Sequence, residues 1–146
     1  MIRTESEYQE AIRRFNQDRE VAEKQKQALI AKGYPPEEVE RGMQPLLSFH
    51  YQLEEEITSY ENLKRGNFTP AKRLTDLGRL LIGMRIASGL TQKQFADRLA
   101  VKESQVSRDE RNEYHGITLA RAQRIIDMLQ ADVTTTVSLG DAVYHQ

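Results

Sequence analysis

The chain has 146 residues and a net charge of -1, with 38% hydrophobic and 29% charged residues, which suits one domain or a small domain with an appendage. It contains no cysteine, which excludes a disulfide framework, a cysteine-based zinc site and a cysteine nucleophile. No stretch approaches a membrane span of about 20 apolar residues and the first residues do not resemble a signal peptide, so we expect a soluble, cytoplasmic protein with no membrane partner.

Two long helices are predicted in the first 66 residues. Thr4 and Glu7 have the spacing of a capping box, and apolar residues then recur at steps of three and four. Gly33 is typical of a helix end, and Pro35-Pro36 followed by two glutamates is typical of a helix start. Because the connection is short, we predict an antiparallel, coiled-coil-like hairpin.

The second of these helices carries a heptad seam. Its members are Val39, Met43, Leu46, His50, Leu53, Ile57 and Tyr60. Gly42 and Pro45 lie inside this pattern and predict a break or kink. Since two helices bury little surface, we expect the seam to pack against a second copy of the chain or a partner protein.

Four short helices are predicted in the second half of the chain. Residues 65–70 have turn chemistry, and apolar helical patterns begin at Leu77. Val133 to Leu139 alternates apolar with polar residues, a weak strand signal. The expected fold is therefore all-α, with a hairpin over residues 1–66, a compact helical unit over 67–133, and a tail over 134–146 that includes a possible strand.

Charge is divided unevenly between these parts. Residues 1–65 carry 10 basic and 13 acidic side chains, a net charge of -3, whereas residues 70–126 carry 11 basic and 6 acidic ones, a net charge of +5. This asymmetry indicates two regions with different roles.

The most informative stretch runs from Gly89 to Glu110. Thr91 is placed to cap a helix that Phe95 anchors inside, and a tight turn leads to a second helix that Val106 anchors. The second helix has a polar outer face, the arrangement with which a helix enters the major groove of DNA.

Over about Leu77 to Val133 the sequence resembles the Cro/C1-type helix-turn-helix regulators, also called the XRE family. The motifs that carry the resemblance are Gly-Leu-Thr-Gln at 89–92, Phe-Ala at 95–96, Leu-Ala-Val at 99–101, Val-Ser-Arg at 106–108 and Glu110. The resemblance implies a lambda-repressor-like helical bundle whose partner is double-stranded DNA.

The candidate DNA contacts fall into two groups. The resemblance implies that the third helix of the bundle reads bases and that Gln92 binds a phosphate. The candidate base-reading residues are Glu103, Ser104, Ser107 and Arg108. The candidate phosphate contacts are Thr91, Gln92, Lys93, Lys102, Arg111 and Asn112.

Individual side chains in these groups have suitable chemistry. Arg108 can donate to guanine O6 and N7, and Glu103 can accept from cytosine N4. The resemblance also implies a structural ion pair between Arg85 and Glu110.

Two residues depart from the family pattern. Ala100 occupies a turn position where glycine is usual, which is tolerable if the residue is not left-handed. Asp109 occupies a position that is usually apolar or aromatic, so it is expected either to be exposed or to pair with a nearby arginine.

These features predict a dimeric DNA-binding regulator, a repressor of its own or a neighbouring promoter, with no catalytic role and no metal or cofactor. His50 and Glu54 have metal-pair spacing, but a lone pair of this kind is more often structural. One alternative keeps the fold and makes the chain an antitoxin of the HigA type, whose acidic hairpin binds a toxin. Another is a bridging protein that contacts transcription proteins and not DNA.

Overall fold

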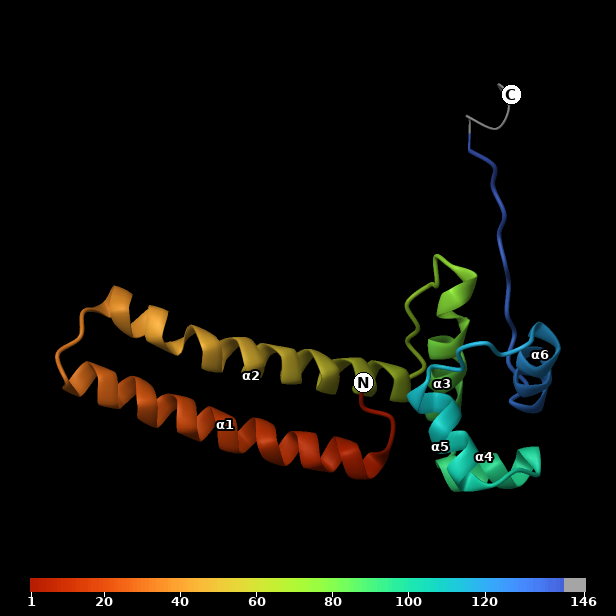
Figure 1. Ribbon diagram of the computed structural model, residues 1–146, viewed down its shortest axis with the longest axis horizontal. Helices are drawn as coiled ribbons and strands as arrows, with labels where there is room; N and C mark the ends of the chain where they lie inside the picture. Colours follow the sequence, from red (N-terminus) through yellow and green to blue (C-terminus); the bar gives the residue numbers. More distant parts are fainter. Residues whose placement is uncertain (141–146) are drawn as a thin grey trace.

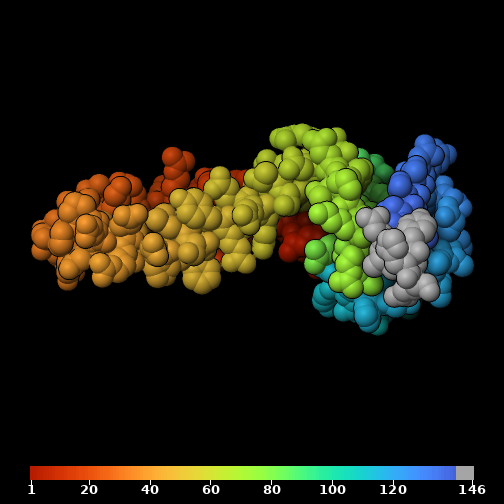
Figure 2. All heavy atoms as spheres, turned by 90° about the horizontal axis from the view of Figure 1, so that it is seen from above, coloured from red at the N-terminus to blue at the C-terminus, as the bar shows by residue number. Residues whose placement is uncertain are grey.

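The computed structural model describes residues 1–140, which form six α-helices and one short 3-10 helix (Figure 1). The elements are α1 (Glu5–Ala31), α2 (Pro36–Lys64), η1 (Leu74–Asp76), α3 (Leu77–Ala87), α4 (Gln92–Leu99), α5 (Glu103–Arg111) and α6 (Leu119–Met128). The predicted combination of a helical hairpin and a compact helical bundle is confirmed. Figure 2 shows the hairpin as a long arm that extends from the bundle. None of the described helices has the length and apolarity needed to cross a membrane.

Local signals in the sequence set the ends of the hairpin helices. The Thr4 hydroxyl accepts a hydrogen bond from the backbone N–H of Glu7 at 3.1 Å, which caps α1. The Glu7 carboxylate accepts from the backbone N–H of Arg3 at 2.9 Å, one residue earlier than in a regular capping box. At the other end Gly33 has a φ of 84°, a left-handed conformation that lets the chain reverse before Pro36.

The heptad seam of α2 packs against α1 of the same chain. Val39, Met43, Ile57 and Tyr60 are buried, and Leu46, His50 and Leu53 are half-buried. The His50 ring stacks on Phe15 with 4.2 Å between ring centroids, and the Tyr60 ring stacks on Tyr8 at 5.0 Å. Within the described residues the seam packs against α1, and its use as an interface with a second copy or a partner stays a prediction.

The predicted break in the second helix is also absent. α2 is one continuous helix from Pro36 to Lys64, with Gly42 and Pro45 inside it. A proline in a helix removes one backbone hydrogen bond. Val39 and Met43 are buried on either side of Gly42, so packing supports the helix through this segment.

The base of the hairpin and the bundle share one hydrophobic core. Ile2, Ala11, Ile57 and Tyr60 from the hairpin belong to the same buried cluster as the core of α3 to α6. The Tyr60 hydroxyl donates to the Glu5 carboxylate at 3.1 Å, and burial together with this hydrogen bond raises the pKa of Tyr60 to about 12. Packing in the shared core thus anchors the hairpin to the bundle, whereas the hydrogen bond between Tyr60 and Glu5 joins the two helices of the hairpin.

The tail does not form the strand that its alternation suggested. Residues 131–140 are extended without any ladder to another described segment, and they run away from the bundle (Figure 1). Val133, Val137 and Leu139 are exposed. Because a strand needs a neighbour to satisfy its backbone groups, an alternating pattern without one remains irregular. The rest of the predicted tail, residues 141–146, lies outside the described residues.

Candidate nucleic-acid interface

Helices α4 and α5 form the two-helix unit at the centre of the candidate interface. The Thr91 hydroxyl accepts from the backbone N–H of Gln94 at 3.1 Å, and the Gln94 side chain accepts from the backbone N–H of Thr91 at 2.9 Å. This capping box fixes the start of α4. Phe95, Ala96 and Val106 are buried and hold the inner faces of the two helices against the rest of the bundle.

The turn between α4 and α5 depends on a left-handed alanine. Ala100 has φ 57° and ψ 40°, which is a left-handed conformation. Alanine was expected to replace glycine here without cost only if the residue was not left-handed, and that condition is not met. The turn is closed by a hydrogen bond from the backbone N–H of Val101 to the carbonyl of Ala96 at 3.0 Å. The alanine side chain makes this conformation costly by about 1 kcal/mol.

Replacing Ala100 by glycine is therefore expected to stabilise the protein by about 0.5–1 kcal/mol, since glycine adopts this conformation freely but loses more entropy on folding. Urea unfolding followed by circular dichroism measures the change. Ala96→Gly is the control, because Ala96 is buried inside α4 and its replacement should destabilise. A lower unfolding midpoint for Ala100→Gly would contradict the assignment of strain to this turn.

A buried ion pair connects α3 to the end of α5. The Arg85 guanidinium donates to both carboxylate oxygens of Glu110, with its Nε at 2.6 Å and its Nη2 at 2.8 Å. Its other N–H groups donate to the carbonyls of Leu90 and Arg3, each at 2.8 Å. Arg85 and Glu110 are 2% and 1% exposed, so this is a fully desolvated hub that ties α3, α5 and the N-terminal segment together.

Gln92 is oriented by the same hub. Its side-chain Nε2 donates to the Glu110 carboxylate at 3.0 Å, and the residue is half-buried at the first position of α4. An amide nitrogen has two N–H groups, so the second one is available to a ligand. The side chain that the resemblance assigns to a DNA phosphate is therefore oriented by the fold itself.

The four candidate base-reading residues lie on the outer part of α5. Glu103, Ser104 and Arg108 are exposed and Ser107 is half-buried. The Arg108 Nε donates weakly to the carbonyl of Ser104 at 3.4 Å, which leaves the terminal nitrogens of its guanidinium toward solvent. On the opposite face Val106 and Glu110 are buried, so one face of α5 holds the fold and the other is free to contact a ligand.

The remaining phosphate candidates are all exposed but differ in how they are engaged. The Thr91 hydroxyl is used as the cap of α4, and Lys93 lies 3.7 Å from the Asp97 carboxylate in an exposed ion pair. Lys102 precedes α5, and Arg111 and Asn112 follow one another at its end. Within residues 1–140 neither Lys102 nor Arg111 forms an ion pair.

Asp109 pairs with an arginine, the second of the two arrangements expected for it. Its carboxylate accepts from Arg121 of α6 at 2.6 Å and from the Gln105 side chain at 3.0 Å. This pair is half-buried and ties α5 to α6. Asp109 therefore supports the orientation of α5 rather than facing a ligand.

The segment that supports the end of α5 was not predicted from the sequence. Glu113 and Tyr114 both have positive φ, at 51° and 54°, and their backbone crosses α3 at Gly78. Tyr114 is buried there, and this burial raises the pKa of its hydroxyl. No local sequence pattern predicts left-handed conformations at a glutamate and a tyrosine in succession. Gly78 in α3 is the one signal that another backbone segment passes close by.

The fold and the comparison with known families agree on the class of this unit. α4 and α5, joined by a short turn and supported by α3 and α6, form a helix-turn-helix. Residues 76–139 match the family model of a helix-turn-helix domain, which confirms the resemblance to Cro/C1-type regulators over this part of the chain. No curated protein and no solved structure has a significant match to the chain. The helix-turn-helix domain supports a DNA-binding regulator.

Proposed function

We propose that the protein is a sequence-specific transcriptional regulator that binds operator DNA as a dimer and represses its own or a neighbouring promoter. In this model α5 enters the major groove, and Gln92 with the surrounding cations holds the phosphates. Regulation would be steric, without catalysis, and would take place in the cytoplasm at the chromosome. On this proposal the chain has two functional parts: residues 67–133 bind DNA, and residues 1–66 support dimerisation or bind a partner.

The observation that carries the proposal is the division of α5 into two faces. Val106, Asp109 and Glu110 use one side of the helix to fix it against α3, α4 and α6. Ser104 and Arg108 are exposed on the other side, where hydrogen-bonding groups can meet base edges, and Glu103 is exposed in the first turn of the helix. Since acidic Glu103 weakens attraction to DNA, one domain alone should bind weakly, which favours two domains acting on two half-sites about 34 Å apart.

The surface for dimerisation is proposed to include the tail. Most of the heptad seam packs against α1, so it offers little surface for an interface between two copies. Val133, Val137 and Leu139 are exposed along an extended segment whose backbone has no ladder partner among the described residues. Pairing of two such segments across a two-fold axis would cover these side chains.

Titration of the full chain against duplexes from its own upstream DNA, at two salt concentrations, tests the proposal. We expect selective binding that weakens with salt and two protomers per site. Arg108→Ala should lose about tenfold to a hundredfold of the preference at one base pair, with little loss at other positions. Lys93→Gln should weaken binding to all sequences and lower the salt slope by about 1.

Two results would contradict parts of this model. Unchanged sequence preference in Arg108→Ala would show that the assigned register of α5 is wrong. Absence of selective binding at either salt concentration would rule out the regulator model. Retention of a transcription protein in that case would favour the bridging role.

A second candidate function, that of an antitoxin, is supported by the surface of the hairpin. Exposed Tyr51 lines a shallow hollow on α2 together with Glu54 and Glu55, and Phe49 is exposed elsewhere on the same helix. Exposed aromatic side chains beside carboxylates suit a basic protein partner. A stable complex with a small basic protein encoded beside this gene, lost on charge reversal of Glu54 and Glu55, would favour this function.

A further inference from the structure

The N-terminal segment is fixed against the helix-turn-helix domain although it belongs to the hairpin. The Arg3 carbonyl accepts from Arg85 Nη2 at 2.8 Å, and the Arg3 backbone N–H donates to Glu7 at 2.9 Å. Ile2 is 6% exposed and packs in the shared core. Arg3 therefore has a defined backbone position beside the hub that also orients Gln92.

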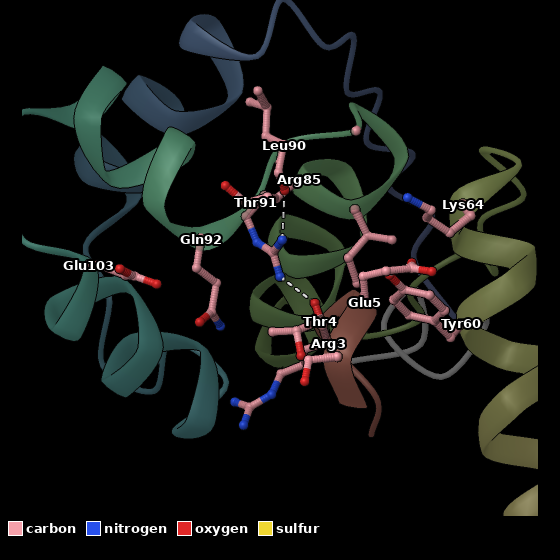
Figure 3. Close-up of a pocket in the computed structure, with 13 residues that line it drawn as sticks. Arg3, Thr4, Glu5, Tyr60, Lys64, Arg85, Leu90, Thr91, Gln92 and Glu103 are labelled. Atoms are coloured by element: carbon pink, nitrogen blue, oxygen red, sulfur yellow. Dashed lines mark hydrogen bonds between the residues drawn. The ribbon is translucent and has the colours of Figure 1, made fainter. Parts of the chain in front are cut away.

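The Arg3 side chain lies on the same side of the molecule as the proposed DNA contacts. It lines a cavity together with Thr91 and Gln92 from the start of α4 and Glu103 from the start of α5. In Figure 3 the Arg3 and Gln92 side chains extend toward the same side of this cavity, whereas the dashed bonds mark the hold of Arg85 on the carbonyls of Arg3 and Leu90. The Arg3 guanidinium forms no ion pair with any of residues 1–140.

We propose that Arg3 is a DNA phosphate contact, so that the interface extends beyond the helix-turn-helix domain to the first residues of the hairpin. The inference rests on the proposed function, because it requires DNA to lie across α5 and the start of α4. A guanidinium is always charged and donates to phosphate oxygens in a planar, paired geometry. It also offsets the carboxylate of Glu103, which lines the same cavity and repels phosphates.

Because the backbone of Arg3 is already fixed, a phosphate contact from this residue costs little conformational entropy. Arg85 and Glu7 hold Arg3 before DNA binds, so only side-chain freedom is lost on binding. The hairpin thereby gains a direct role in DNA binding, separate from any role in dimerisation or partner binding.

Arg3→Gln in the full chain tests the inference, because it removes the charge and keeps the carbonyl that Arg85 requires. We expect DNA affinity about threefold to tenfold lower for selective and unrelated duplexes alike, with unchanged sequence preference. The slope of log affinity against log salt should fall by about 0.9 per protomer. Arg3→Lys should retain most of the slope, since it retains the charge.

Lys26→Gln is the matched control, because Lys26 is an exposed cation in the last two turns of α1, the helix whose C-terminal end lies far from the bundle (Figure 1). It should leave affinity and salt slope unchanged. If Arg3→Gln behaves like Lys26→Gln while the unmodified chain binds its operator, the role of Arg3 is wrong and the proposed function stands. If the unmodified chain does not bind selectively, both are overturned.

Discussion

Replacing Gly78 by alanine is expected to destabilise the helix-turn-helix domain by about 3 kcal/mol or more, with a loss of DNA binding that follows from unfolding. A Cβ atom at this position would lie 1.8 Å from the carbonyl oxygen of Glu113 and 2.7 Å from its carbonyl carbon. These are backbone atoms of a left-handed segment, so neither a rotamer change nor a small shift relieves the overlap. Urea unfolding followed by circular dichroism measures the effect.

Gly42→Ala provides a matched control with the opposite expected sign. Gly42 also lies inside a helix, but a Cβ there would be 3.4 Å from the tip of the Leu29 side chain, an ordinary contact. Because alanine is the better helix former, we expect a gain of about 0.5–1 kcal/mol. Equal stability of Gly78→Ala and the unmodified chain would show that α3 and residue 113 are not in close contact.

The second large effect is expected at the buried ion pair. Glu110→Ala leaves the Arg85 guanidinium desolvated with no anion to balance it, and should cost about 3–5 kcal/mol of unfolding free energy. The double variant Arg85→Met, Glu110→Leu removes both charges and should be more stable than Glu110→Ala alone. It should not recover fully, because the carbonyls of Leu90 and Arg3 lose the donor they share.

An exposed pair in the same domain serves as the control. Lys93 and Asp97 are about two-thirds exposed at 69% and 66%, and Asp97→Ala should change stability by no more than about 0.5 kcal/mol. The single variants Arg85→Met and Glu110→Leu complete a double-mutant cycle with the double variant, which gives the coupling energy of the buried pair. A cost below about 1 kcal/mol for Glu110→Ala would contradict the view that this pair holds α5 in place.

Elements set by local chemistry were predictable from the sequence. Gly33 and Pro36 mark the reversal of the hairpin, and Thr91 and Thr118 cap α4 and α6 through hydrogen bonds to residues three positions on. Each of these signals involves neighbours along the chain, so a single sequence contains all the partners. The all-α fold followed from them, and the helix-turn-helix unit followed from the motifs of residues 89–110 together with the family resemblance.

Features that depend on a distant partner were not predictable. A heptad seam has the same pattern whether it faces α1 or a second chain, and the structure places α1 on it. The alternation from Val133 to Leu139 has no strand beside it among the described residues. The hydrogen bond from Arg85 to the carbonyl of Arg3 joins residues that are 82 positions apart. Since every residue has a backbone carbonyl, the sequence does not indicate which one Arg85 will bind.

The candidate site was predictable from the sequence only in part. Its residue types came from the motif, and Glu103, Ser104 and Arg108 are all exposed on α5 in the structure. The engagement of Gln92 with Glu110 and of Asp109 with Arg121 required the folded arrangement. Whether these side chains contact DNA remains a prediction for the titrations described above.

The two faces of α5 also bear on how a regulator of this kind can diverge. Substitutions at Glu103, Ser104 and Arg108 touch no core side chain, whereas Val106 and Glu110 are locked by packing and by the hub. Changes on the outer face can therefore accumulate with little effect on stability. A lineage could acquire new operators by exchanging these few surface positions while the scaffold stays the same, and a designer could transplant a foreign recognition surface onto this chain by the same route.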